Sequence, residues 1–161
     1  MGMYPMAIYS VYLVLDGESK PLLENFRKRY DSLSGKIEAH VTVVFPTECE
    51  KPDPFVEAVH QLNCSDRFGI SLGDQIIYDG AVGYVCVLAG APQITEIYTH
   101  LSKRLALKSP YQYRPHVTVL RDSRRSPEKI DFCHSDYEVS GIVVEEIMQD
   151  EVSRVVFHRR F

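Results

Sequence analysis

The sequence lacks several features that mark common classes of protein. Its four cysteines, Cys49, Cys64, Cys86 and Cys133, form no C-x-x-C spacing and have no histidine pattern beside them, so we expect free thiols. No metal site and no cofactor are expected. An excess of positive charge is absent as well. The formal net charge of −4 argues against a protein that holds duplex DNA or long RNA through many phosphate contacts.

A long apolar run is also missing. The N-terminal stretch MAIYSVYLVL is interrupted by a serine and tyrosines, lacks a basic flank and leads directly into DGESK, so it is typical of neither a membrane span nor a signal peptide. With 161 residues, the chain is predicted to form a single domain over residues 1–161. We expect a cytoplasmic monomer without a membrane partner.

Hydrophobic periodicity predicts that strands and helices alternate along the chain. The predicted strands cover residues 7–15, 40–45, 67–72, 75–78, 82–88, 116–120, 137–144 and 152–157. Helices are predicted from residue 22 to a stop at Ser34-Gly35, from Pro54 to residue 62, and from Pro92 to residue 105, with a short helix over residues 126–130. Residues 47–54 are expected to form a loop, and Gly73-Asp74 and Asp79-Gly80 to form turns. This pattern indicates the α+β class, with antiparallel sheets covered on their outer faces by helices.

The two halves of the chain show the same order of elements. Each has a strand, a long helix, a strand that reads HVTV, a short helical piece and then further strands. The first half covers about residues 7–80 and the second about residues 81–161. We therefore predict two similar halves related by a pseudo-twofold axis.

The tetrapeptide HVTV begins at His40 and again at His116. Side chains on a strand alternate between its faces, so the histidine and the threonine two residues later share one face, and the valines share the other. The valines are expected to face the core. His40 with Thr42, and His116 with Thr118, are expected to meet across a cleft if the pseudo-twofold axis passes between the two strands.

Two imidazoles and two hydroxyls form a set suited to phosphoryl transfer without a metal. A neutral histidine can take a proton from the attacking oxygen, and a protonated one can give a proton to the leaving oxygen. Histidine suits both roles because its ordinary pKa of about 6.5 lies near neutral pH. The threonine hydroxyls can donate hydrogen bonds to the non-bridging phosphate oxygens.

Other readings remain open at this stage. One His-x-Thr in a β-branched strand is a weak signal, and two unrelated copies in an ordinary α+β protein would leave the histidines far apart. Tyr111, Tyr113 and Arg114 precede the second motif and are candidates for stacking on a base or holding a phosphate, or for packing. His60, His100, His134 and His158 have no motif around them and are expected to be structural or exposed.

The flanks of the two motifs resemble those of the 2H phosphoesterase superfamily, which includes the LigT-like 2′-5′ RNA ligases and cyclic phosphodiesterases. The first motif continues to an aromatic residue, Phe45, and the second has Pro115 before it and Arg121 after it. One departure from the family pattern is Pro46. The resemblance implies a bilobal, pseudo-twofold fold in which two antiparallel sheets line a central cleft, with helices on the outside.

By the same resemblance, His40 and His116 are the catalytic acid and base, and Thr42 and Thr118 bind the phosphate. Phe45 and Arg121 are further candidates for substrate binding, as is Tyr113, although Phe45 could equally belong to the core. Strict alternation would place Arg121 on the valine face of its strand.

The implied activity is that of a metal-independent phosphodiesterase acting on a 2′,3′-cyclic phosphate or a 2′-5′-linked end of a nucleotide or short RNA. Ligation of a 2′,3′-cyclic end to a 5′-hydroxyl is the same chemistry in reverse. The alternative is a binding module of the same fold that holds a nucleotide or RNA end without turning it over.

Overall fold

The computed structural model describes residues 5–78, 84–109, 112–122, 124, 137–149 and 152–161. Seven strands and three helices are found within these ranges. The strands are β1 (Ala7–Asp16), β2 (His40–Cys49), β3 (Phe68–Tyr78), β4 (Tyr84–Gly90), β5 (His116–Leu120), β6 (Tyr137–Ile147) and β7 (Ser153–Arg160). The helices are α1 (Lys20–Tyr30), α2 (Asp53–His60) and α3 (Pro92–Arg104).

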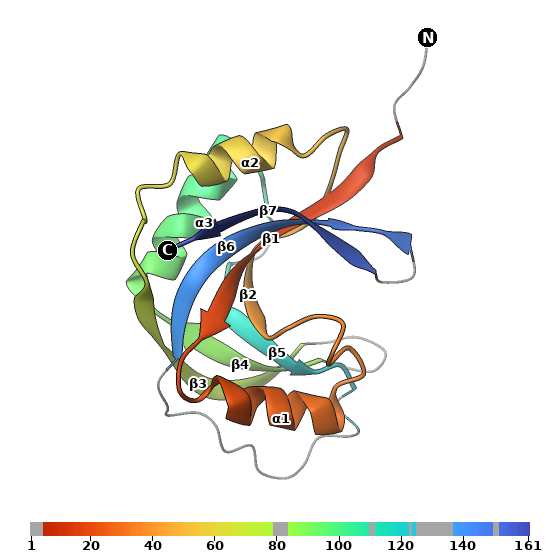
Figure 1. Ribbon diagram of the computed structural model, residues 1–161, viewed down its shortest axis with the longest axis vertical. Helices are drawn as coiled ribbons and strands as arrows, with labels where there is room; N and C mark the ends of the chain where they lie inside the picture. The colour runs from red at the N-terminus through yellow and green to blue at the C-terminus, as the bar shows by residue number, and fades with distance from the viewer. Residues whose placement is uncertain (1–4, 79–83, 110–111, 123, 125–136, 150–151) are drawn as a thin grey trace.

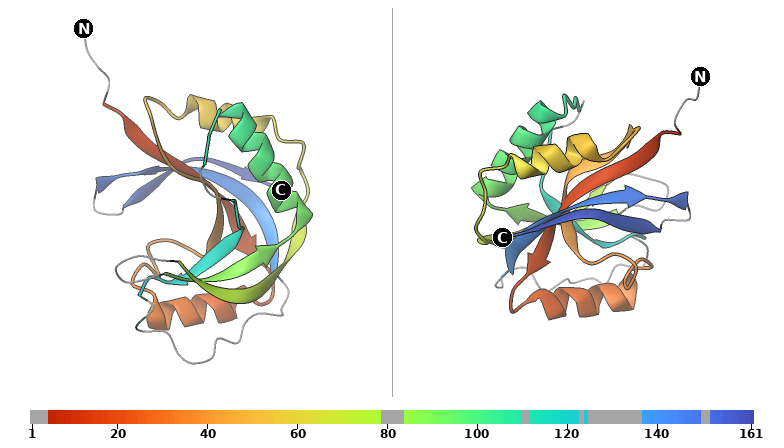
Figure 2. Two further views of the ribbon diagram at one scale, coloured as in Figure 1. Left: turned by 180° about the vertical axis from the view of Figure 1, so that it is seen from behind. Right: turned by 45° about the horizontal axis from the view of Figure 1, so that its top comes forward.

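All described strands pair in antiparallel fashion and join one sheet in the order β1-β2-β5-β4-β3-β6-β7, with a further pairing of β1 to β6. The long strand β6 pairs through Tyr137–Val139 with β3 and along most of its length with β1. The sheet therefore curves strongly, with α2 and α3 on one side and α1 on the other (Figure 1). Figure 2 shows the same curvature from behind.

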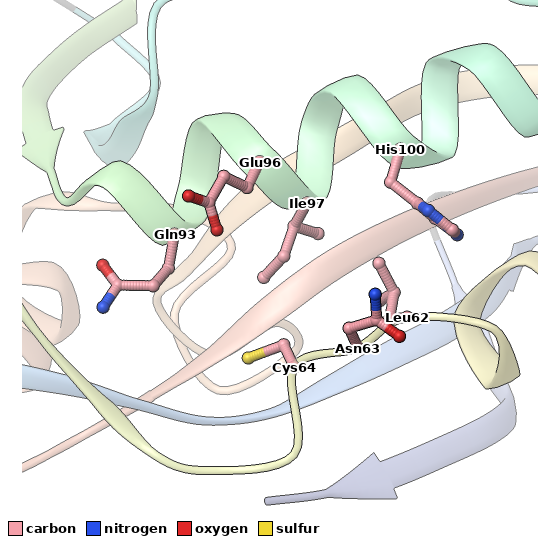
Figure 3. A pocket seen from close by; sticks show the side chains of 7 residues that line it. All are labelled: Leu62, Asn63, Cys64, Gln93, Glu96, Ile97 and His100. Carbon is pink, nitrogen blue, oxygen red and sulfur yellow. The ribbon is translucent and has the colours of Figure 1, made fainter.

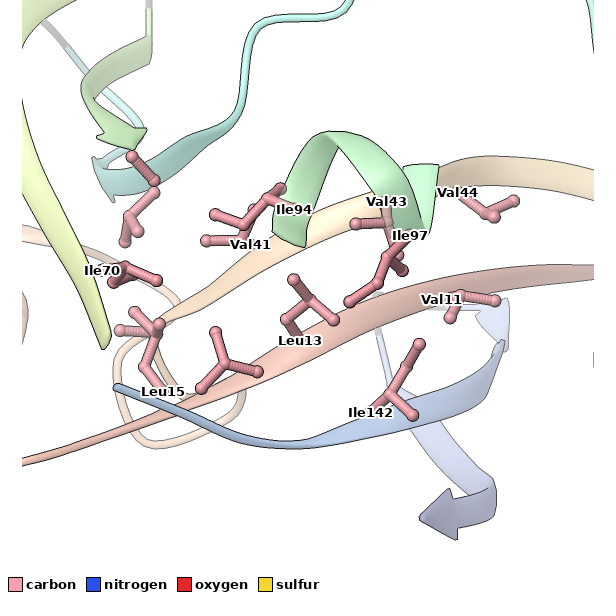
Figure 4. Close-up of a cluster of buried hydrophobic side chains, with 14 of the residues drawn as sticks. Val11, Leu13, Leu15, Val41, Val43, Val44, Ile70, Ile94, Ile97 and Ile142 are labelled. Atoms are coloured by element: carbon pink, nitrogen blue, oxygen red, sulfur yellow. The ribbon is translucent and has the colours of Figure 1, made fainter. Parts of the chain in front are cut away.

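The hydrophobic core lies between the sheet and the helices. On β1, the alternate residues Val11, Leu13 and Leu15 are fully buried, as the periodicity of this strand predicts. Val41 and Val43 of β2 lie beside Ile94 and Ile97 of α3 (Figure 4). The packing of these apolar side chains fixes which face of each strand is turned away from the helices.

Each long helix packs against the motif strand of the other half of the chain. Helix α1, from the first half, contacts β5, and α3, from the second half, contacts β2. A pseudo-twofold relation between the halves would produce such an exchange, and that relation stays a prediction. The antiparallel α+β class is confirmed, whereas the division into two separate lobes and the boundary between the two repeats stay predictions.

Several predicted boundaries differ from those of the structure. Strand β2 does not end before Pro46 but runs to Cys49. Phe45 and Pro46 lie in an irregularity of the β1–β2 ladder, between the pairs Val11–Val44 and Tyr9–Thr47, where the missing N–H of proline costs no ladder hydrogen bond. The predicted turn at Gly73-Asp74 is likewise an irregularity, within the continuous strand β3.

Helix α1 ends at Tyr30, several residues before the predicted stop. The backbone N–H of Asp31 still bonds to the carbonyl of Arg27, and the chain then turns through Gly35 at a φ of 88°. The predicted turn at Asp79-Gly80 and the predicted short helix at 126–130 fall outside the described residues. No helix in the described ranges is both long and apolar enough to cross a membrane.

Candidate active site

The two HVTV motifs lie on adjacent strands. Strands β2 and β5 meet in the sheet, and in the described part of the chain their ladder consists of one pair, Val41 with Val117. Continued by one residue on either side, this antiparallel register sets His40 opposite Thr118 and Thr42 opposite His116. The two histidines are then diagonal neighbours on the face away from the valines, about 7–8 Å apart at the backbone.

A bulge occurs at the same position of both motifs. In the β1–β2 ladder Tyr12 pairs with Thr42 and Val11 with Val44, so Val43 is the extra residue. In the β4–β5 ladder Cys86 pairs with Thr118 and Val85 with Leu120, so Val119 is the extra residue. The local structure of the two motifs is therefore repeated, as well as their sequence.

The bulges change the face on which the following residues lie. Val44 and Leu120 are 1% and 0% exposed and take core positions, and in β2, which continues beyond its bulge, this turns the next residue to the histidine side. Phe45 is accordingly 49% exposed, and its ring stacks on that of His116 with centroids 6.3 Å apart. The core alternative for Phe45 was therefore wrong, because alternation is broken at Val43.

Arg121 occupies the equivalent position after the second bulge. Its guanidinium forms an ion pair with Asp31, at the end of α1, and its side chain is 17% exposed. Because Val119 is an extra residue and Arg121 follows the last residue of β5, strict alternation does not assign a face to Arg121. The positive charge of Arg121 also acts on His40.

Each motif histidine makes an equivalent hydrogen bond, to the backbone carbonyl two residues before it. Nδ1 of His40 lies 2.7 Å from the carbonyl oxygen of Glu38, and Nδ1 of His116 lies 2.8 Å from that of Arg114. A carbonyl oxygen only accepts, so each Nδ1 carries a hydrogen and donates it. Nε2 is therefore the nitrogen of each neutral ring that accepts a proton.

Burial lowers the pKa of both histidines. The pKa of His40 falls to about 4, mainly because burial disfavours the charged form, against the opposing bond to the Glu38 carbonyl. Positive charges on Arg121, Arg27 and His116 lower it further. The pKa of His116 is also lowered by burial, against the opposing bond to the Arg114 carbonyl, and the positive charge of Arg114 lowers it further. The charge of His116 acts on His40, in line with the diagonal placement of the two residues.

The threonines and their neighbours differ between the two motifs. Thr118 Oγ1 lies 3.6 Å from Sγ of the buried Cys86, whose pKa is raised to about 11 by burial. In the first motif, Thr42 pairs with Tyr12. The ring of Tyr12 packs against that of His40, with centroids 4.7 Å apart. Burial raises the pKa of Tyr12 to about 12, so its hydroxyl stays protonated near neutral pH.

Tyr113 ties the second motif to the first. Its hydroxyl donates a 2.7 Å hydrogen bond to the backbone carbonyl of Thr42, and its ring stacks on Tyr98 of α3 with centroids 3.8 Å apart. The ring also lies edge-on to Phe45, with centroids 6.4 Å apart. Tyr113 is thus placed beside the candidate site, with its hydroxyl engaged in holding β2.

Sequence reasoning missed Tyr12, Cys86 and a buried charged group on α1. Tyr12 and Cys86 lie opposite the motif threonines, which only the strand pairing reveals. Arg27 had a signal in the sequence. It lies four residues after Leu23 and three before Tyr30, on the apolar stripe of the helix, where a cation needs a partner.

The other histidines do not join this group. His60 packs against Phe157, and His100 lies 3.3 Å from the carbonyl oxygen of Ala58 on the helix side. His158 lies exposed on β7, and His134 falls outside the described residues. In the described part of the chain, no group of three or more histidine, cysteine, aspartate or glutamate side chains could hold a metal ion.

A pocket of about 370 Å³ lies between α3 and the segment after α2 (Figure 3). Ile97 lies in its wall, and the same helix backs the valine face of β2. The pocket is therefore on the helix side of the sheet, across the strand from His40. The full lining comprises Leu62, Asn63, Cys64, Gln93, Glu96, Ile97 and His100.

Solved structures with the same fold are known. E. coli LigT in complex with 3′-AMP is 14% identical, with a TM-score of 0.68, over 98% of this chain and 99% of that chain. TT0787 of Thermus thermophilus is 14% identical, with a TM-score of 0.71, over 95% of this chain and 97% of that chain. Usb1 of Kluyveromyces marxianus is 8% identical, with a TM-score of 0.59, over 96% of this chain and 98% of that chain. The fold is therefore LigT-like, with a sheet of seven antiparallel strands and three helices in the described ranges.

The sequence itself identifies the family. The family model of the 2′-5′ RNA ligase superfamily matches residues 15–141, most of the chain. No curated protein sequence matches significantly. The chain belongs to the 2′-5′ RNA ligase superfamily, a superfamily of 2H phosphoesterases, and the resemblance seen in the motif flanks is confirmed.

Proposed function

We propose that the chain is a metal-independent phosphodiesterase that hydrolyses a 2′,3′-cyclic phosphate or a 2′-5′ linkage at the end of a nucleotide or short RNA. The observation that carries the proposal is the pairing of two HVTV motifs on adjacent strands, with the same bulge and the same Nδ1 hydrogen bond in each. Solved structures of the neighbour LigT with 3′-AMP, ATP and phosphate support a nucleotide or phosphate ligand.

His40 is the proposed general base. Its lowered pKa of about 4 keeps the ring neutral near neutral pH, and Nε2 can accept the proton of a water molecule. As the water oxygen forms its bond to phosphorus, the bond from phosphorus to the leaving ribose oxygen breaks. His116, protonated at Nε2, gives its proton to that oxygen. Loss of a proton from His40 and uptake of one by His116 then restore the starting state.

Thr42 and Thr118 are the proposed phosphate ligands. The register sets each threonine opposite a motif histidine, so their hydroxyls can donate hydrogen bonds to the non-bridging oxygens, where charge concentrates in the transition state. Phe45 offers an exposed ring beside His116 on which a nucleobase can stack. The net charge of −4 favours a short end over a long RNA held by its backbone.

An assay in EDTA tests this function. Purified protein is incubated with 2′,3′-cyclic nucleoside monophosphates, 2′-5′-linked dinucleotides and an RNA with a 2′,3′-cyclic end, with and without the chelator. We expect turnover of at least one substrate, at the same rate in both conditions. Nucleotide binding by calorimetry without any product would identify the alternative, a binding module, and would contradict the enzyme.

The pH dependence of kcat/KM is expected to be bell-shaped with an acidic optimum. Activity rises through about pH 4 as the free enzyme's His40 loses its proton. It falls again as His116 loses its own proton, at a pH below the ordinary histidine value of about 6.5 because the pKa of His116 is lowered. A bound phosphate favours the charged imidazoles, so the kcat profile is expected at higher pH than that of kcat/KM. A profile that is flat from about pH 4 to 9 would contradict the acid–base pair.

A further inference from the structure

A chain of ion pairs runs from helix α1 to the end of the second motif strand. We call its members, Glu24, Arg27, Asp31 and Arg121, the α1 relay. Arg27 Nη1 lies 3.1 Å from Glu24 Oε2, and Arg27 Nη2 lies 3.2 Å from Asp31 Oδ2, the same oxygen that pairs with Arg121. The side chains of Arg27 and Asp31 are 1% and 0% exposed. The centre of the relay is therefore shielded from water.

One end of the relay holds the segment directly before the first motif. Glu24 Oε1 accepts a 2.7 Å hydrogen bond from the backbone N–H of Ala39, the residue that precedes His40. Arg27 Nη2 donates a 2.6 Å hydrogen bond to the carbonyl of Ile37. The other end is Arg121, which follows the last residue of β5. The relay thus joins the entry to the strand of His40 to the exit from the strand of His116.

The direct link between these two strands is short. In the described ranges, β2 and β5 share the single pair Val41–Val117, whereas β1 and β2 share an extended ladder. One residue pair constrains the relative position of two strands weakly. Burial of Arg27 and Asp31 is also costly, because apolar side chains of similar volume avoid the desolvation of two charges. The short β2–β5 ladder and the cost of burying Arg27 and Asp31 both favour a role of the relay beyond helix stability.

We propose that the α1 relay positions His40 relative to the strand that carries His116. Arg27 and Asp31 are positioning residues, because their observed contacts are with the relay and the backbone around it. The inference rests on the proposed function, in that the aligned histidines are the proposed acid and base. The relay also carries the positive charges of Arg27 and Arg121, which contribute to the lowered pKa of His40.

Three variants of α1 separate the effect of the position of His40 from the effect of the positive charge on Arg27. Arg27→Met removes the guanidinium and leaves Asp31 paired with Arg121, while Arg27→Lys keeps the charge but loses the fork that reaches several partners at once. Arg29→Met is the matched control, since Arg29 is exposed on the same helix, with its guanidinium over Tyr30. The readouts are kcat and KM on a 2′,3′-cyclic nucleotide, and the titration of the His40 imidazole by NMR, which needs no substrate.

We expect Arg27→Met to lower kcat about 10-fold or more, because small displacements of catalytic groups slow a reaction strongly, with KM changed less than about 2-fold. Its His40 pKa is expected to rise above the value of about 4. Arg27→Lys should keep that pKa near the wild-type value and recover part of kcat. Arg29→Met should match the wild type in both readouts.

A folded Arg27→Met protein with wild-type kcat overturns the proposal, whatever its His40 titration, because loss of the charge alone raises that pKa. If circular dichroism shows that Arg27→Met does not fold, Arg27→Lys decides: a reduced kcat with an unchanged His40 pKa supports the relay, and a wild-type kcat overturns it. If the wild-type protein hydrolyses nothing, the proposed function fails, yet the NMR titration still tests the relay. His40 imidazole signals that differ from the wild type in Arg27→Lys, which keeps the charge, and not in Arg29→Met then support it, and unchanged signals in Arg27→Lys overturn it.

Discussion

The His116→Ala variant is expected to lose at least ~10²-fold in kcat, with a smaller change in KM, because a positioned general acid contributes about 10²–10⁴-fold. His40→Ala should lose a similar factor as the general base. The two histidines act on one proton-transfer sequence, so the double variant should be only slightly slower than either single one. Steady-state kinetics on the substrate found in the EDTA assay measures all three.

A histidine outside the site provides the control. His60 is exposed on α2, on the helix side of the sheet, and His60→Ala should keep wild-type kcat and KM. Thermal unfolding of each variant shows whether the fold is retained. Wild-type kcat in a folded His40→Ala or His116→Ala protein would exclude the proposed mechanism.

Replacing the motif threonines has the next largest expected effect. Valine has nearly the shape of threonine but no hydroxyl, so Thr42→Val and Thr118→Val each remove one donor to the phosphate. Loss of one such donor costs about 10²–10³-fold in kcat in sites that stabilise an oxyanion. We expect about 10²-fold for each threonine, mainly in kcat, since the charge to be stabilised is largest in the transition state.

Thr95 offers a matched control, because it is exposed on α3 and Thr95→Val makes the same chemical change. The two motif variants also differ in the contacts that they remove. Thr118→Val loses the contact of the hydroxyl with the Cys86 thiol as well as the donor to the phosphate, whereas Thr42 pairs with Tyr12. Equal kcat in Thr42→Val, Thr118→Val and Thr95→Val would show that the hydroxyls do not bind the phosphate.

Much of the candidate site could be predicted from local patterns. Strand alternation correctly placed Val41 and Val117 in the core, both fully buried, and left His40 and His116 on the other face. The repeated tetrapeptide indicated that the two polar pairs belong together. Their adjacency in the sheet was beyond local reasoning, because it depends on the pairing of β2 with β5, which lie far apart in the sequence.

The bulges mark the limit of prediction from periodicity. Nothing in HVTVVF or HVTVLR distinguishes a regular strand from one with an extra residue. The sequence therefore left the core open for Phe45, and strict alternation was no guide to the face of Arg121 beyond the bulge. The length of β2 was missed because proline usually ends a strand, and here Pro46 lies in a second irregularity. The buried Arg27 was visible as a charge within an apolar stripe, but the link through Asp31 to Arg121 was not.

In the proposed mechanism, the two HVTV motifs together form one phosphate site. NMR spectra that follow the imidazole signals of His40 and His116 during a titration with inorganic phosphate report on both motifs at once. The account predicts that both signals shift together with a single dissociation constant, and that both shifts are lost in Thr42→Val combined with Thr118→Val. Signals that respond with different constants, or a response of one histidine alone, would contradict a shared site.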